Sequence, residues 1–64
     1  MLYTITSKFK IKNAKTGKIQ DEERTQTDVD LDSRKQGIQW HKDKIERIYG
    51  LRLVGNITTT VKKV

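Results

Sequence analysis

Lysine recurs at every second position of one stretch near the start of the chain, at Lys8, Lys10 and Lys12. Alternate side chains of an extended strand point to the same face, so these three ammonium groups would project together. Arg52 and Lys62, in a later stretch that we expect to belong to the same sheet, would join them. Rows of cations can neutralise the phosphates of a nucleic-acid backbone. The same row also fits an exposed sheet face that only provides solubility and blocks aggregation.

A second group with binding chemistry has helical spacing and consists of Trp40, Lys44 and Arg47. Residues three and four positions apart lie on one flank of a helix. An indole there can stack on a base or anchor a protein interface, while the neighbouring cations contact phosphates or acidic side chains. An indole can equally close the edge of a small core with a lysine stacked above it.

Catalytic chemistry has few candidates in this chain. There is one histidine, His41, and no cysteine. A histidine-based triad would need Ser7 or Ser33 beside His41, and neither serine lies in a nucleophile-elbow sequence. We expect His41 to pack on the core side of its helix and to hydrogen-bond locally. We therefore predict no catalytic residue and no enzymatic activity.

Three aspartates, Asp28, Asp30 and Asp32, have the spacing of the first ligands of a calcium-binding loop. That loop also requires a glycine where this chain has Ser33 and a bidentate glutamate where it has Gln39. Solvated charges in front of a helix explain the aspartates better. No glycine-rich phosphate loop is present either, so we expect neither a metal nor a cofactor.

The basic row requires a strand, and the sequence predicts a β-hairpin. Apolar and polar residues alternate from 3 to 12, which is typical of a half-buried antiparallel strand. The following Asn-Ala-Lys-Thr-Gly predicts a tight turn with Gly17 in the left-handed conformation. We expect Ile11 to lie opposite Ile19 in this hairpin. That register places Lys8 opposite Glu22 and turns the acidic side chains of Asp21 and Glu23 toward the core. A bulge in the strand would relieve this conflict, and so would a hairpin end that extends beyond the helix.

The tryptophan flank requires a helix, which we predict between Ser33 and Gly50. Ser33 and Gln36 have the spacing of a capping box. Gly50 suits the left-handed position after a helix, with Leu51 folding back on Ile45. At about 100° per residue, one face collects the residues that we expect to be buried, namely Ile38, His41, Ile45, Ile48 and Tyr49.

After the helix, apolar residues again alternate with polar ones. We expect the inner set to be Leu51, Leu53, Ile57 and Val61. Gly55-Asn56 interrupts this set, either as a bulge in one bent strand, which we prefer, or as a two-residue turn. The predicted fold is α+β in the order ββαβ. It has an antiparallel sheet of three strands, or four if Gly55-Asn56 is a turn, with one helix on one face.

Length and charge limit the classes of protein that fit. We expect the 64 residues to form a single domain over 1–64, with a stability of about 3 to 5 kcal/mol that dimerisation would supplement. Fourteen Lys and Arg against eight Asp and Glu give a net charge of +6, yet six of the acids lie in residues 21–33. No signal-peptide pattern or long apolar run is present, so we expect a cytoplasmic protein with no membrane partner.

The leading hypothesis is a small basic, non-enzymatic module that binds nucleic acid through Lys8, Lys10, Lys12, Arg52 and Lys62, assisted by Trp40. The alternative is a protein-interaction module, either a small inhibitor or accessory protein, or a homo-oligomer such as a homodimer. It would use an exposed strand edge together with Trp40, Lys44 and Arg47. In size and pattern alone, the chain resembles small accessory proteins of phages and mobile elements, and we assign no residue role from that resemblance.

Overall fold

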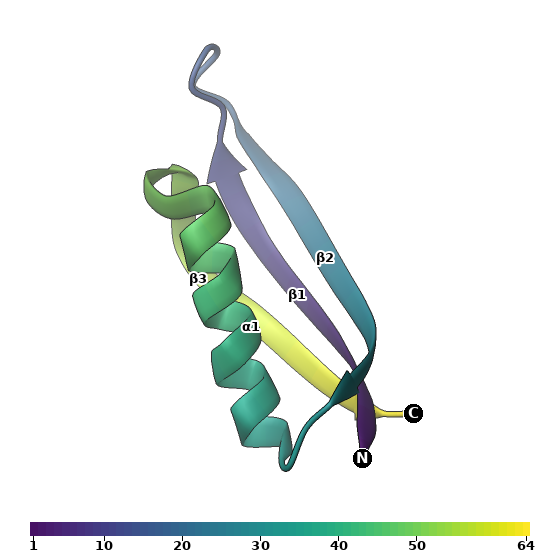
Figure 1. Ribbon diagram of the computed structural model, residues 1–64. Helices are drawn as coiled ribbons and strands as arrows, with labels where there is room; N and C mark the ends of the chain where they lie inside the picture. Colours follow the sequence, from purple (N-terminus) through teal and green to yellow (C-terminus); the bar gives the residue numbers. More distant parts are fainter.

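One three-stranded antiparallel sheet and one helix make up the computed structural model, which describes residues 1–64 (Figure 1). The elements are β1 (Leu2–Lys12), β2 (Ile19–Asp30), α1 (Arg34–Tyr49), the short 3-10 helix η1 (Gly50–Arg52) and β3 (Leu53–Lys63). β1 is the central strand, in the order β2-β1-β3. The predicted ββαβ order and α+β class are confirmed.

The hairpin register differs from the prediction by one residue. Lys12, not Ile11, lies opposite Ile19. The turn sets this register, because the Asn13 amide donates to the Lys18 carbonyl and the Asn13 side chain accepts from two further amides of the turn. Gly17 adopts the predicted left-handed conformation, with φ of +73°.

The shift of one residue exchanges the two faces of β2. Asp21 and Glu23 move to the outer face, opposite Lys10 and Lys8, and the predicted conflict with the core disappears. Ile19 moves outward with them and is 56% exposed.

A bulge at the other end of β2 returns apolar residues to the core. The pairing shifts between Tyr3 and Ile5 of β1, and Asp28 takes a positive φ of +55°. An extra residue in one strand reverses the side-chain alternation beyond it. Val29 therefore lies opposite Tyr3 and packs against the core together with the buried Leu31.

The helix begins much as the sequence predicts. The Ser33 hydroxyl accepts from the Gln36 amide at 3.2 Å, while the Gln36 side chain accepts from the Asp32 amide at 2.9 Å. The reciprocal bond thus reaches one residue further back than in the usual capping box.

The end of the helix corrects one prediction. Gly50 has the expected positive φ of +53°, but its ψ of −122° lies outside the left-handed helical region, and Leu51 is 105% exposed and does not fold back on Ile45. The reason is that Gly50 starts η1, which carries Leu51 away from the sheet. Leu51 is therefore not part of the inner set, and Ile48, which is also exposed, lies outside the buried stripe.

β3 is one bent strand, as we preferred. Lys8 lies opposite Thr58 and Lys10 lies opposite Val54. Residues 55–57 of β3 therefore lie opposite a single residue of β1, Phe9. Gly55 takes a φ of +75° in this bulge. On either side of it, Leu53 and Ile57 pack against the core and Val61 is buried, as predicted.

The core consists of two apolar clusters on the face of the sheet that α1 covers. One contains Tyr3, Ile5, Leu31 and Val61, and the other contains Phe9, Ile11 and Ile45. Gly37 lets α1 pack closely on the core, because a Cβ there would lie 2.5 Å from Leu31 Cδ1 and 3.4 Å from Ile5 Cδ1 of β1. No sequence motif marks this glycine.

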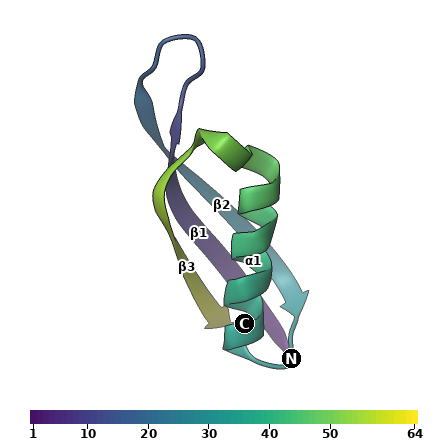
Figure 2. The same ribbon diagram turned by 90° about the vertical axis from the view of Figure 1, so that its left-hand side faces the viewer.

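The helix lies over β3 and β1 and covers little of β2. Figure 2 shows α1 on a single side of the sheet, with the hairpin of residues 13–18 extending past the end of the helix. One face of the sheet is therefore open to solvent, and the inner side of β2 is only partly shielded. No helix of the structure has both the length and the apolar character needed to cross a membrane.

Candidate functional site

The open face of the sheet carries four exposed lysines, which we call the lysine face: Lys8, Lys10, Lys12 and Lys62. The first three project from the central strand, because the residues between them point into the core. Lys62 lies on β3, opposite Thr4. Four of the five cations predicted for this surface therefore share it.

The fifth cation, Arg52, was wrongly placed on this face. It lies in η1, before β3 begins, and its guanidinium carbon is 5.4 Å from the centre of the Tyr49 ring. The outward turn at Gly50 that exposes Leu51 also moves Arg52 off the strand.

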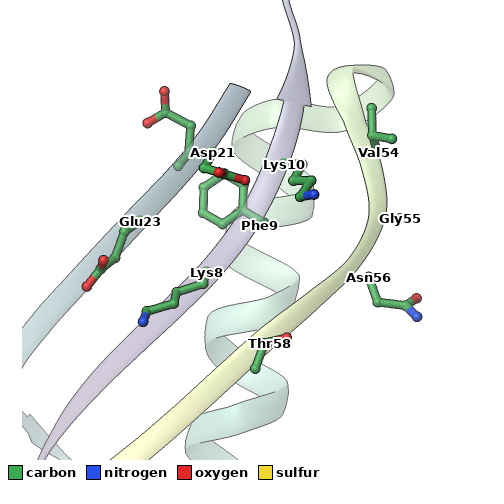
Figure 3. Close-up of a pocket in the computed structure, with 10 residues that line it drawn as sticks. Lys8, Phe9, Lys10, Asp21, Glu23, Val54, Gly55, Asn56 and Thr58 are labelled. Atoms are coloured by element: carbon green, nitrogen blue, oxygen red, sulfur yellow. The ribbon is translucent and has the colours of Figure 1, made fainter. Parts of the chain in front are cut away.

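Two carboxylates share the open face with the lysines. Asp21 and Glu23 lie on β2, directly opposite Lys10 and Lys8 (Figure 3). Neither makes an ion pair within 4.0 Å, since the one such pair in the protein joins the amino terminus to Asp30. β2 carries five acids and one arginine, so its net charge is −4, whereas β1 carries +3 and β3 carries +2.

A hollow of about 590 Å³ opens on this face beside the bulge of β3. Figure 3 shows Lys8 and Lys10 of β1 between the acids of β2 and the Gly55–Asn56 segment of β3. The bulge creates this space, because β3 bends away from β1 there. A polar group of a ligand could enter it next to two ammonium groups.

The rest of the open face is rich in hydroxyl groups. Thr25, Thr6 and Thr60 form a row across the three strands, and the hydroxyls of Thr6 and Thr25 are 3.2 Å apart. No aromatic side chain is exposed on this face, because Phe9 lines the hollow but is only 4% exposed, and the others lie in the core or on α1. This face therefore offers donors for phosphate oxygens and no platform for base stacking.

Trp40 lies in the helix layer, on the opposite side of the sheet from the lysine face. It is 37% exposed and shares a small hollow with Val29 and Leu31 of the core edge. Lys44 Nζ lies 5.4 Å from the Trp40 ring centre and donates to Gln26 Oε1 at 2.9 Å. Arg47 is exposed further along the same flank. Trp40 therefore cannot contact a ligand that lies flat on the lysine face.

A buried polar chain crosses the core between the two apolar clusters. Ser7 Oγ lies 2.5 Å from His41 Nδ1 and 2.8 Å from Thr59 Oγ1. Ser7 is 0% exposed and His41 is 1% exposed. The prediction that His41 packs inward is confirmed, but its hydrogen bond is not local, because Ser7 is 34 residues away in the chain.

The Ser7–His41 contact resembles a nucleophile beside a base, but its surroundings differ from those of a hydrolase. The serine is sealed inside the core, and the third member of the chain is a threonine hydroxyl, not a carboxylate. Nowhere do three or more His, Asp or Glu side chains gather in a way that could hold a metal ion.

The comparisons with known proteins give no relative. The chain matches no protein-family model, no curated protein and no solved structure. Functional inference for this chain therefore rests on the geometry described above.

Burial makes folding stability depend on the protonation of His41. Burial, and then the positive charges of Lys44 and Arg24, hold the pKa of His41 below its ordinary value of 6.5. The unfolded chain binds this proton more tightly, so we expect stability to fall as the pH drops below about 6.5, by at most about 1.4 kcal/mol per pH unit. The loss should end once the pH is below the folded-state pKa.

Urea unfolding at about pH 7.5 and 5.5, followed by Trp40 fluorescence, measures this effect. The His41→Gln variant has no imidazole and should show a smaller difference between the two pH values. Equal pH dependence in both proteins would show that His41 is not the group responsible.

Proposed function

We propose that this protein is a non-enzymatic module that binds nucleic acid through the lysine face. One observation gives this proposal its main support. Four lysines from two adjacent strands lie exposed on one face, and none has a carboxylate within 4.0 Å. Unpaired ammonium groups in such an array can replace the counterions that surround a phosphate backbone.

The distribution of charge indicates how the nucleic acid would lie. Asp21 and Glu23 would repel phosphates at the β2 side, so the backbone would follow β1 and β3. Thr58 and Thr60 on β3 add exposed hydroxyls that can donate to phosphate oxygens. Because the face has no aromatic side chain, we expect duplex to bind at least as well as single strands.

Fluorescence anisotropy with labelled duplex and single-stranded DNA and RNA tests the proposal. If all four lysines contact phosphates, affinity should fall by about 100-fold between roughly 50 and 200 mM salt. The four nucleic-acid forms compared at the same salt would identify the preferred ligand. Absence of binding at the lower salt concentration would refute the proposal.

A protein-interaction module is the second candidate, and one observation favours it. The outer edges of β2 and β3 are both unpaired, and Trp40 lies partly exposed beside the end of β2. An open strand edge can pair with a strand of a partner or of a second copy, and an exposed indole can anchor the contact. Under this alternative, Trp40→Ala weakens the complex, whereas changes to the lysine face have little effect.

A further inference from the structure

A groove separates α1 from β2 on the helix-covered side of the sheet, and it reaches around the outer edge of β2 to Glu23 and Thr25. Its volume is about 430 Å³, and we call it the α1–β2 groove. It exists because α1 lies over β1 and β3 and leaves the inner side of β2 largely uncovered. β2 contributes Glu22, Arg24 and Gln26 to its lining, and α1 contributes His41, Lys44 and Tyr49.

Two cations in this groove retain unused hydrogen-bond donors. Arg24 Nε donates to the Tyr49 hydroxyl at 2.9 Å, which leaves both terminal amino groups of the guanidinium without an acceptor. Lys44 Nζ donates one hydrogen bond, to Gln26 Oε1, and has two hydrogens left. Neither cation has a carboxylate within 4.0 Å. The groove therefore presents two positive charges from opposite walls, beside the carboxylates of Glu22 and Glu23 that also line it.

His41 can supply a third donor. Its Nδ1 is engaged by Ser7, which is in turn bonded to Thr59, so Nε2 is the ring nitrogen left for a ligand. When Thr59 donates to Ser7 and Ser7 donates to Nδ1, the imidazole proton resides on Nε2. Burial holds the ring in this orientation, because His41 is packed between the two core clusters.

We propose that the α1–β2 groove binds the phosphate group of a small phosphate monoester, held between Arg24 and Lys44 with His41 Nε2 as a further donor. A monoester carries a charge of about −1.5 to −2 at neutral pH, so it can pair with Arg24 and Lys44 at once. Its tetrahedral oxygens can accept from several directions at once, including the fork of an arginine.

The acids of β2 favour a small ligand over a nucleic-acid strand. Glu22 and Glu23 also line the groove, and β2 as a whole carries a net charge of −4. An extended polyanion passing along this strand would meet those carboxylates, whereas a single phosphate can lie between Arg24 and Lys44. The cations of this site therefore differ from those of the lysine face, although Glu23 borders both.

The charges around His41 provide a way to observe binding. Lys44 and Arg24 contribute to the low pKa of His41, so an anion bound between them would offset their effect. The chain has one histidine and one tryptophan, and Lys44 lies over the tryptophan ring. The imidazole NMR signals and the indole fluorescence therefore each report on this site without ambiguity of assignment.

The experiment is a titration with inorganic phosphate and with a nucleoside 5′-monophosphate, using sodium chloride of equal ionic strength as the reference. We expect saturable shifts of the His41 signals with a Kd of about 1 mM or tighter. At saturation, the pKa of His41 should rise by about 1 unit, because a nearby anion favours the imidazolium. Trp40 fluorescence should change over the same concentration range.

Matched variants separate this site from general charge effects. Arg24→Gln and Lys44→Gln each remove one groove cation and should weaken phosphate binding by about tenfold or more. Lys35→Gln removes an equal charge from an exposed position in the first turn of α1 and should leave binding unchanged. Circular dichroism checks that each variant is folded. If Arg24→Gln is unstable, Lys44→Gln, which keeps a polar side chain at its position, still tests the site.

Three outcomes would overturn the proposal. The first is a His41 response to phosphate no larger than the response to chloride. The second is an equal loss of binding in Lys35→Gln. The third is that a DNA duplex without terminal phosphates shifts the NMR signals of His41 as much as the monophosphate does, because the groove would then bind polyanions. If the two surfaces are independent, anisotropy should show duplex binding while the NMR signals of His41 stay unchanged.

Discussion

The double variant Lys8→Glu/Lys10→Glu should bind nucleic acid at least 100-fold more weakly than the wild-type protein at about 50 mM salt. Both lysines are exposed in the middle of the central strand. Their replacement removes two phosphate contacts and adds two carboxylates next to Asp21 and Glu23. The residual binding should also depend less on salt, because fewer counterions are released. Anisotropy titrations at two salt concentrations measure both effects.

Two control variants show whether position or total charge is responsible. Arg34→Glu/Lys35→Glu reduces the net charge by the same amount from exposed positions in the first turn of α1. Acids there are favourable to the helix dipole, so the fold should persist, and binding should weaken far less. Asp21→Asn/Glu23→Gln removes the acids that face the lysines and should tighten binding. Equal weakening by the Lys8/Lys10 and Arg34/Lys35 pairs would contradict a role for the lysine face.

The sequence predicts the main features of this fold because its local signals agree with one another. The alternation in β1, the left-handed Gly17 and the Ser33 cap each appear in the structure. The hairpin register was wrong by one residue, because the closing pair of the turn is Asn13 with Lys18. The alternation of side chains in β1 cannot determine that pairing. A slip of one residue changes only which side chains of β2 face the core, and β2 has too few apolar residues to favour one register.

The end of the helix shows a second limit of sequence reasoning. An apolar residue after a C-terminal glycine is typical of a helix stop that folds back on the helix. Here the chain enters η1 instead, which exposes Leu51 and carries Arg52 away from β3. Both errors follow from a single choice of backbone conformation at Gly50, and composition does not determine that choice.

The sequence reveals the two proposed binding surfaces unequally, for a physical reason. The lysine row is a local feature of one strand, so Lys8, Lys10 and Lys12 could be identified from the sequence. The α1–β2 groove instead combines residues far apart in the chain, such as Arg24 and Tyr49. Its one local signal was a lone arginine among the acids of β2. The partners of His41 were equally hidden, because Ser7 and Thr59 come from two different strands.

The substitution Ile45→Ala should nearly unfold the protein. Ile45 is 0% exposed and packs with Phe9 and Ile11 in the second core cluster. Loss of such a side chain costs about 2 to 5 kcal/mol. A domain of this size has a total stability of about 3 to 5 kcal/mol, so most of the folding free energy would be lost. Urea unfolding followed by Trp40 fluorescence gives the free energy directly.

Leu51→Ala is the matched control, because it truncates an apolar residue that sequence periodicity also places in the core. In the structure Leu51 is fully exposed, so its truncation should change stability by less than about 0.5 kcal/mol. A loss as large as that of Ile45→Ala would mean that Leu51 folds back on the helix after all. Arg52 would then lie beside β3, and the positive surface would include the fifth cation that the sequence predicts. The same pair of variants therefore tests both the core and the boundary of the lysine face.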